Sequence, residues 1–253
     1  MTITFLGTGT SIGVPVLACN CPVCLSDDAR DKRLRTSAMV TIGGRNLVID
    51  CGPDFRMQML QNKVDEIDAI LFTHDHRDHI AGLDDVRAFN YVLNKKIMVF
   101  GTTEVMKAIH TVFPYVFCET RFFGSPQISV QIIDEKPFDI NSIRVVPIKA
   151  MHNKLPVLGF RINDFTYITD ASYISEQELE KVRGSKVMVV NALRNSKHIS
   201  HFSLTEALEV IAKAKPEKAY ITHISHFLGL HGDVEKKLPS NIHLACDNLV
   251  VEL

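Results

Sequence analysis

The densest group of chemically active side chains lies in residues 71–85, LFTHDHRDHIAGLDD, and contains His74, His76, His79, Asp75, Asp78 and Asp84. Imidazole and carboxylate groups are common ligands of Zn, Mn and Fe. His74 and His76 are two residues apart and can converge on one ion, while Asp78 and His79 can offer an oxygen and a nitrogen to a second ion. The spacing therefore favours a two-metal site over its alternative, a polar loop with helix-capping aspartates and solvated histidines.

Short apolar or alternating runs with β-branched residues predict the strands that must position these side chains. The expected strands are 3–8, 37–43, 46–52, 69–74, 96–101, 143–150, 165–171, 186–193, 218–224 and 242–253. The strand at 69–74 ends where the histidines begin, so the cluster is expected on a loop at a strand's carboxyl end, where functional sites tend to lie.

Helical patterns lie between several of these strands, at residues 54–62, 102–113, 175–184 and 203–215. Ser203 and Glu206 have the spacing of a capping box at the start of the last helix. Met57, Met59 and Met106 fall in helical patterns and are expected to fill the core. Strands interspersed with helices, without a linker or repeat, predict one α/β domain over residues 1–253, with two sheets packed face to face and helices outside.

Composition narrows the functional classes. Twenty-eight basic residues face 29 acidic residues, so the net charge of −1 gives no long-range attraction to nucleic acid or to an anionic membrane. The first residues have no basic segment of a signal peptide, and we find no run of about 18 apolar residues that would cross a membrane. We therefore expect a cytoplasmic protein, in which the six cysteines stay reduced.

The segment THDHRDH resembles the HxHxDH signature of the metallo-β-lactamase superfamily, and other parts of the chain match the same family in order. The family's earlier aspartate, which orients the ligand loop, matches Asp50 in LVIDCGPD. Its later ligands match His152 in IKAMHN, Asp170 in YITDAS and His223 in YITHIS. The resemblance implies the αββα sandwich of this superfamily, with two mixed sheets flanked by helices.

The resemblance also implies how the ligands are divided between two metals. The first metal would be held by His74, His76 and His152, the second by Asp78, His79 and His223, and Asp170 would bridge them. Two ions held in this way can clamp the oxygens of a phosphoester during hydrolysis. The oxygen ligands admit Mn or Fe as well as Zn.

A cysteine cluster near the N-terminus, LACNCPVCLSD, places Cys19, Cys21 and Cys24 in a C-x-C-x2-C pattern. Three thiolates are one ligand short of a closed tetrahedral zinc site. The fourth ligand would be His226 in THISH, an arrangement that resembles the PhnP-like branch of the superfamily, the phosphodiesterases associated with carbon–phosphorus lyase. This predicts one structural zinc; three buried or redox-active cysteines are the alternative.

The resemblance to this branch covers essentially the whole chain, and it assigns catalytic roles to His201 and Asp78. His201 in HISHFSL matches a histidine beside the scissile phosphate, where it could protonate the leaving oxygen or neutralise phosphoryl charge. His198 is the alternative for that role. The implied function is hydrolysis of a small phosphodiester, of cyclic or linear type, by a dimetal enzyme.

Two other functions are weighed against the phosphodiesterase. A transfer-RNA 3′-processing endonuclease shares the histidine motif but usually carries a projecting basic arm; only 17 residues separate His152 from Asp170, which leaves no room for an arm there, and the net charge is near zero. A non-hydrolytic protein of cofactor biosynthesis would share the cysteine loop but typically degrades the HxHxDH set. The aromatic segment 112–126 is a candidate for core, substrate lid or homodimer contact.

Overall fold

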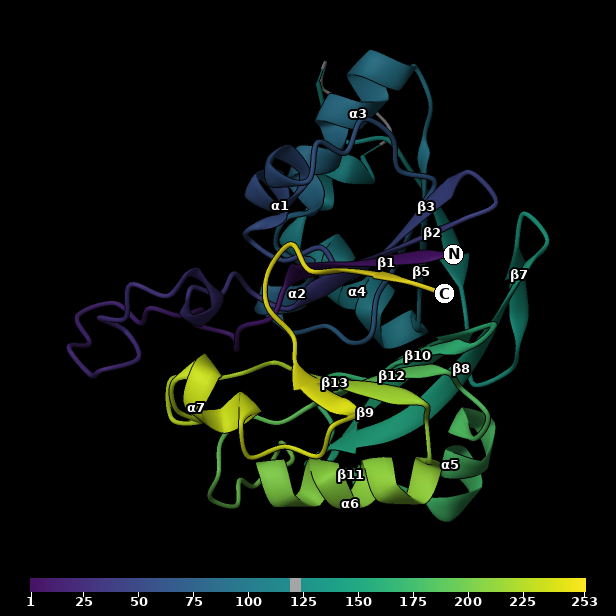
Figure 1. The fold of residues 1–253 in the computed structure, drawn as a ribbon. Helices are drawn as coiled ribbons and strands as arrows, with labels where there is room; N and C mark the ends of the chain where they lie inside the picture. Colours follow the sequence, from purple (N-terminus) through teal and green to yellow (C-terminus); the bar gives the residue numbers. More distant parts are fainter. Residues whose placement is uncertain (119–123) are drawn as a thin grey trace.

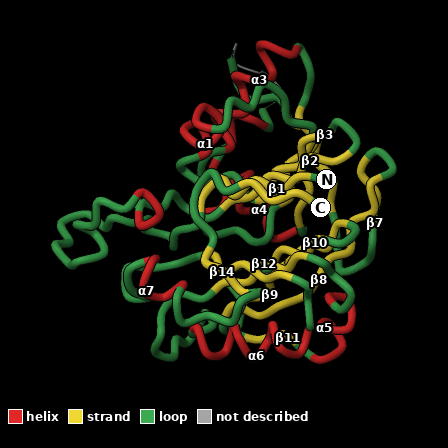
Figure 2. The backbone as a smooth tube through the Cα atoms, in the orientation of Figure 1, coloured by secondary structure: helices red, strands yellow, loops and turns green. Residues whose placement is uncertain are grey.

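Two β-sheets lie face to face with helices on their outer faces in the computed structural model, which describes residues 1–118 and 124–253 (Figure 1). The strands of both sheets gather in the middle of the molecule, between two groups of helices (Figure 2). The predicted αββα sandwich is therefore confirmed.

The first sheet has the strand order β15-β1-β2-β3-β4-β5-β6. Its strands are β1 (Thr2–Gly7), β2 (Ser37–Ile42), β3 (Arg45–Ile49), β4 (Ala69–Leu71), β5 (Ile97–Gly101), β6 (Ile128–Ile132) and β15 (Val250–Glu252). The strands from β3 to β6 are parallel, and the other neighbours are antiparallel. Because β1 pairs with β15, the two chain ends lie side by side (Figure 1).

The second sheet has the order β11-β8-β9-β10-β12-β13-β14, and β7 pairs with β8. Its strands are β7 (Phe138–Ile140), β8 (Ile143–His152), β9 (Leu155–Ile162), β10 (Phe165–Tyr167), β11 (Tyr173–Ile174), β12 (Val187–Asn191), β13 (Lys218–Thr222) and β14 (Ile242–Leu244). The run β10-β12-β13-β14 is parallel. Only Asn153 and Lys154 connect β8 to β9, and Asn153 has the positive φ of 56° that a tight hairpin turn favours.

The helices are α1 (Phe55–Gln61), α2 (Arg77–Ile80), α3 (Val86–Leu93), α4 (Thr103–Val112), α5 (Glu176–Val182), α6 (Leu204–Ala214) and α7 (His231–Glu235), with 3₁₀ turns at Ala29–Asp31, Leu83–Asp85 and Pro114–Val116. The four helices predicted from the sequence are present as α1, α4, α5 and α6, each with ends within two residues of the predicted ones, whereas α2, α3 and α7 are not among the predictions. The predicted capping box is present: Ser203 accepts from the Glu206 N–H while Glu206 accepts from the Ser203 N–H. Within the described residues, no helix is long and apolar enough to cross a membrane.

Three apolar layers hold the sandwich together. The central layer lies between the sheets and includes Phe5, Phe160 and Tyr167; outer layers lie under α1 to α4 and under α5 and α6. Complete burial of one large apolar side chain contributes about 1.5–3 kcal/mol. These layers fix the two sheets against each other and so fix any residues that project from their shared edge.

Two of the three methionines behave as predicted. Met59 and Met106 are buried, but Met57 is 49% exposed, so the core prediction for Met57 is wrong. On α1, Met57 is two residues from both Phe55 and Met59, which places it on the opposite side of the helix. In the aromatic segment 112–126, Phe113 and Val116 are core residues, while residues 119–123 lie outside the described part of the chain.

Candidate metal centre

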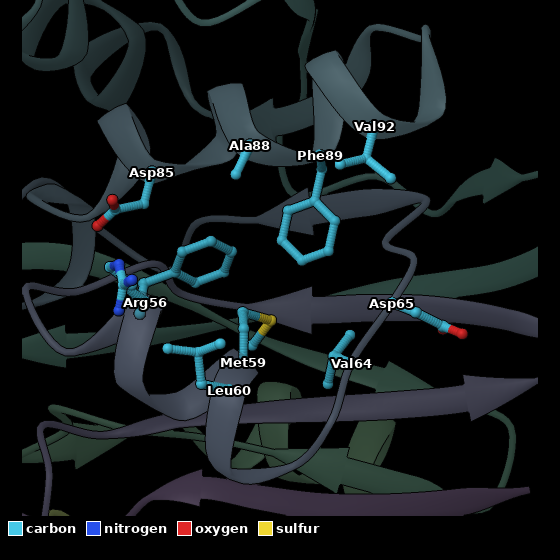
Figure 3. Close-up of a pocket in the computed structure, with 10 residues that line it drawn as sticks. Arg56, Met59, Leu60, Val64, Asp65, Asp85, Ala88, Phe89 and Val92 are labelled. Carbon is cyan, nitrogen blue, oxygen red and sulfur yellow. The ribbon is translucent and has the colours of Figure 1, made fainter.

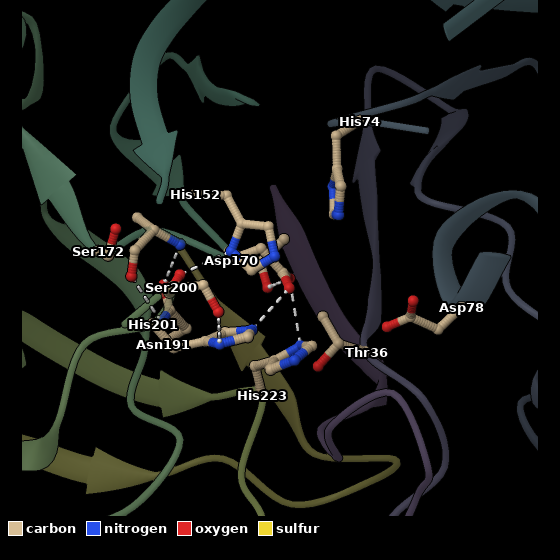
Figure 4. A network of polar contacts seen from close by, with 12 residues as sticks. Thr36, His74, Asp78, His152, Asp170, Ser172, Asn191, Ser200, His201 and His223 are labelled. Carbon is tan, nitrogen blue, oxygen red and sulfur yellow. Dashed lines mark hydrogen bonds and ion pairs between the residues drawn. The ribbon is translucent and has the colours of Figure 1, made fainter. Parts of the chain in front are cut away.

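The candidate site lies at one edge of the sandwich, where strands of both sheets end (Figure 4). Asp50 follows β3 and His74 follows β4 in the first sheet. His152 ends β8, Asp170 follows β10 and His223 follows β13 in the second sheet. Because the carboxyl ends of neighbouring parallel strands share an edge, residues far apart in sequence meet here.

The backbone itself turns sharply at three of these positions. Asp50, Asp170 and His223 have φ values of 63°, 54° and 55°, in the left-handed region that most residues avoid. Each of the three residues stands one or three residues past the end of its strand, so the chain leaves the sheet there. Such strain is common at functional sites, where the surrounding structure holds it.

The predicted ligands fall into two groups, as the resemblance implied. The ligand atoms within each group all lie within 4.8 Å of one another, and the two groups are His74, His76, His152 and Asp78, His79, His223. Asp170 contacts the second group, because its Oδ2 atom is 3.2 Å from Nε2 of His79 and 3.2 Å from Nδ1 of His223, and its ligand atoms also lie within 4.8 Å of those of His152 in the first group. Asp170 also forms a compact trio with His74 and His79.

Among the described residues, three buried ring nitrogens at this site make no well-aligned hydrogen bond: Nε2 of His74, Nε2 of His79 and Nδ1 of His223, the last two of which lie 3.2 Å from Oδ2 of Asp170. A buried polar atom without a partner costs about 1–3 kcal/mol, so each one requires an explanation. His74 and His79 offer ligand atoms within 4.8 Å of Asp170, and His79 and His223 offer them within 4.8 Å of Asp78, so divalent ions held by these groups would satisfy the three nitrogens. The donor set therefore fits the metals that this fold family binds.

Burial keeps two of these imidazoles neutral, which leaves their lone pairs free for a metal. It lowers the pKa of His74 well below its usual value and lowers that of His223 to about 4. For His79, burial also lowers the pKa, but Asp170, Asp50 and Asp78 outweigh it and raise the pKa well above its usual value. The surroundings of His79 thus favour positive charge, which a divalent cation would supply.

The bridging carboxylate is ionised despite its burial. Desolvation raises the pKa of Asp170, but the imidazoles of His223 and His79 outweigh it, and the net pKa lies well below the usual value. Asp78 shows the same balance, with burial opposed mainly by His79. Both carboxylates are therefore available as anionic ligands.

Asp50 orients the ligand loop through Thr73 and His79. The Thr73 N–H donates to Oδ1 of Asp50 at 2.8 Å, and its hydroxyl donates to Oδ2 at 2.9 Å. Nδ1 of His79 lies 2.7 Å from Oδ2 of Asp50. Such outer contacts fix the tautomer and direction of a ligating ring. Sequence reasoning missed Thr73, although its place directly before His74 in LFTHDH is a usable signal.

His201 lies beside the ligands, within reach of the same reacting atoms. Its Nε2 atom is 3.0 Å from Oδ1 of Asp170, and its Nδ1 atom is 3.0 Å from Oγ of Ser200 and 3.2 Å from Nδ1 of His198. The carbonyl of Ser200 lies 2.6 Å from Nδ1 of His152. The structure thus brings His201 to the site and puts His198 behind it.

The cysteine cluster forms a second, separate donor set. Nδ1 of His226 is 3.3 Å from Sγ of Cys19 and 3.4 Å from Sγ of both Cys21 and Cys24. A hydrogen bond from the Cys24 N–H lowers the pKa of Cys21 to about 6, which favours its thiolate. Three sulfurs around one imidazole nitrogen match a tetrahedral zinc set.

An apolar groove between α1 and α3 lies away from both donor sets. Its walls include Phe55, Met59 and Phe89, with Arg56 at one end (Figure 3). It contains none of the candidate ligands, and it plays no part in the chemistry derived below.

Comparison with known proteins identifies the family. A model of the β-lactamase superfamily domain matches residues 45–224, and the chain belongs to the metallo-β-lactamase superfamily. The fold and the histidine signature indicate a metal-dependent hydrolase of this superfamily. A crystal structure of a diphosphatase from the PhnP family is similar to this chain, with a TM-score of 0.93, 34% identity and coverage of 100% of this chain and 97% of that one.

Two curated relatives are longer than this chain. An octanoyltransferase from Porphyromonas gingivalis is 36% identical over 252 residues, which cover 98% of this chain and 51% of the relative. A ribonuclease Z from Saccharolobus islandicus is 26% identical over 174 residues, which cover 67% of this chain and 55% of the relative. The chain thus spans about half the length of these two relatives.

Proposed function

We propose that this protein is a dimetal phosphodiesterase that hydrolyses a small phosphodiester of cyclic or linear type. The observation that carries the proposal is the convergence of the two ligand groups around Asp170, with three buried ring nitrogens that make no well-aligned hydrogen bond among the described residues. His74, His76 and His152 would hold one divalent ion, of Mn, Zn or Fe. Asp78, His79 and His223 would hold the other, with Asp170 between them.

The reaction that this arrangement supports is attack of water on phosphorus. Two divalent ions at the site supply Lewis acidity and neutralise phosphate charge. The water oxygen bonds to phosphorus, the ester P–O bond breaks, and the leaving oxygen takes a proton. In this proposal His201 donates that proton, and its place beside Asp170, with Nε2 3.0 Å from Oδ1, supports the role.

The PhnP-family diphosphatase supports phosphoryl chemistry, because it is 34% identical to this chain over its whole length. Because that neighbour is a diphosphatase, phosphoanhydrides belong among the substrates to be tried. The octanoyltransferase gives weaker guidance, since this chain corresponds to only half of that protein.

A transfer-RNA 3′-processing endonuclease is the second candidate, favoured by the ribonuclease Z relative. Between β8 and β9, where the sequence left no space for a basic arm, the chain has a two-residue turn. A net charge of −1 also gives little attraction to a polyanion. A non-hydrolytic cofactor-biosynthesis protein is less well supported, because all seven candidate ligands converge.

The cysteine set supports a structural zinc as a further part of the proposal. Cys19, Cys21 and Cys24 would bind it together with His226, which stands three residues after His223. Such an ion would tie the N-terminal loop to the segment that carries His223, and so stabilise the position of that ligand.

The proposal is tested by turnover and metal content of the purified chain. Substrates are bis(4-nitrophenyl) phosphate, a 2′,3′-cyclic nucleotide, a linear dinucleotide, an asymmetric diphosphate diester and a precursor transfer RNA. We expect hydrolysis of the small diesters that stops after chelation and returns with Mn or Zn. Cleavage of the precursor RNA alone would establish the endonuclease instead, and no hydrolysis of any substrate by metal-loaded protein would refute both.

A further inference from the structure

Asn191, at the carboxyl end of β12, binds both backbone groups of the residue that follows the bridging aspartate. Its Oδ1 atom accepts from the Ala171 N–H at 2.8 Å, and its Nδ2 atom donates to the Ala171 carbonyl at 3.0 Å. Asn191 and Ala171 are both fully buried. An isolated buried amide is costly, so this two-point contact is a strong local constraint.

This contact supports Asp170, the residue directly before Ala171, whose backbone is strained. Asp170 has a φ of 54°, and it carries the carboxylate that stands between the two ligand groups. A strained residue keeps its conformation only when its neighbours hold it. Asn191 lies on the adjacent parallel strand β12. It supplies that support through Ala171, the residue directly after Asp170.

Ala171 also holds the segment that carries His201, the candidate proton donor. The Ala171 carbonyl accepts a second hydrogen bond, at 2.8 Å, from the N–H of Phe202, the residue directly after His201. Ala171 is therefore joined on one side to Asp170 and, through Phe202, to His201. Figure 4 shows Asn191 beside His201 and Asp170, behind the ring of ligands.

We propose that Asn191 is a positioning residue that fixes the bridging carboxylate of Asp170 and the imidazole of His201 relative to each other. The inference rests on the proposed function for its kinetic part, while its metal-binding part can be tested without turnover. Asn191 touches neither substrate nor metal in this assignment; it acts through the backbone of Ala171.

The test compares Asn191→Ala and Asn191→Leu with the wild type. Leucine has a similar branched shape without hydrogen-bonding groups, so it removes the contact while filling the space. The control is Thr166→Val. Thr166 lies on β10, the strand that leads to Asp170, and the substitution removes the 2.7 Å contact between its buried hydroxyl and that of Ser185. Melting temperature, metal affinity by chelator competition, and kcat on aryl and alkyl diesters are measured for each.

We expect both Asn191 variants to lose metal affinity or kcat by about 10–100-fold, the usual effect of removing a contact that orients a ligand. The kcat loss should be larger for alkyl than for aryl diesters, because a displaced His201 protonates the leaving oxygen poorly. Thr166→Val should lower the melting temperature without changing affinity or kcat.

Two results would overturn the assignment. Asn191 variants that melt at a lower temperature but keep wild-type metal affinity and leaving-group dependence would make Asn191 a purely structural residue. A Thr166→Val variant with the same losses would show that any weakening of this strand suffices. Wild-type protein that binds metals but hydrolyses no diester would refute the proposed function, and the affinity measurements would still judge Asn191.

Discussion

His201 and Asp170 are 31 residues apart in sequence, yet Nε2 of His201 lies 3.0 Å from Oδ1 of Asp170. The other carboxylate oxygen of Asp170 faces His79 and His223. One carboxylate thus contacts the candidate proton donor with one oxygen and the candidate metal ligands with the other. In the proposed function this single side chain would couple proton transfer to metal binding.

Replacing His201 should separate the two roles. His201→Ala is expected to keep its metals while kcat falls by about 10²–10⁴, the usual range for one acid–base group. The loss should be smallest for nitrophenyl esters, whose leaving group needs least protonation, and largest for alkyl or ribosyl esters. The exposed His110 provides a matched control, since His110→Ala should behave as wild type. Equal losses on all esters would favour charge neutralisation over proton donation.

Replacing the bridging residue should remove activity without unfolding the protein. Asp170→Ala is expected to abolish measurable turnover and to weaken metal binding, because no other carboxylate within residues 1–118 and 124–253 is grouped with both His74 and His79. Circular dichroism should show the wild-type fold, since the apolar layers do not involve this side chain. Normal turnover in this variant would disprove the ligand assignment.

The cysteine cluster predicts a tightly held zinc. Purified protein should contain up to three metals per chain, one of them resistant to mild chelation, and Cys21→Ser should lose that one. Cys118→Ser is the matched control, because Cys118 is exposed and outside the cluster. Elemental analysis decides the matter: zinc-free protein with three intact thiols would rule out this structural site.

Metal removal should destabilise the whole fold, because the ligands come from both sheets. At a free metal concentration of 100 times Kd, one bound ion adds about 2.7 kcal/mol. For a chain of this size that corresponds to a rise in melting temperature of roughly 5–10 °C. Calorimetry of stripped and reloaded protein measures it. Identical melting temperatures for the two forms would mean that no ion joins the sheets.

The partly buried carboxyl of Asp247 predicts a pH dependence of stability. Burial raises its pKa from 3.8 to about 6 in the folded protein, although the Leu34 N–H and the Thr8 hydroxyl donate to it. The folded state therefore binds this proton more tightly than the unfolded state. The resulting stability is fully present below pH 3.8 and is lost as the pH rises through about 6.

Over that interval the Asp247 contribution to the free energy of unfolding should fall by up to about 3 kcal/mol. Asp247→Asn does not titrate, so the difference between wild type and variant isolates this group from the histidines. Urea unfolding at pH 4, 5, 6 and 7 measures it. A constant difference across these pH values would show that Asp247 keeps its ordinary pKa.

Local patterns in the sequence predict the ligand loop and most strands correctly, because a strand followed by HxHxDH is a continuous signal. They miss the short strands β7 and β11. They also miss β9, whose sequence LPVLGFRI contains proline and glycine, and β6, which is half exposed and lacks a clear apolar face. The convergence of His152, Asp170 and His223 follows only from the family resemblance, since no local pattern tells which strand edges meet.

The supporting contacts are harder still to predict. Asn191 closes an ordinary apolar strand, VMVVN, and only the neighbouring parallel strand reveals that its amide faces Ala171. Thr73 and Ser200 likewise act through a backbone group or a hydroxyl. Many residues carry such groups, so the sequence does not reveal these roles. Their roles depend on sheet register, which is set by packing across the whole sandwich.

The left-handed backbone at Asp50, Asp170 and His223 creates a conflict between durability and turnover. Glycine adopts this conformation freely, whereas a residue with a side chain is disfavoured there by about 1 kcal/mol or more. A laboratory evolution experiment that selects the metal-stripped protein only for heat resistance should therefore enrich glycine or asparagine at these positions and lose catalysis. A second experiment that also screens for diester hydrolysis should keep Asp50, Asp170 and His223. The two selected populations should therefore differ first at these three positions.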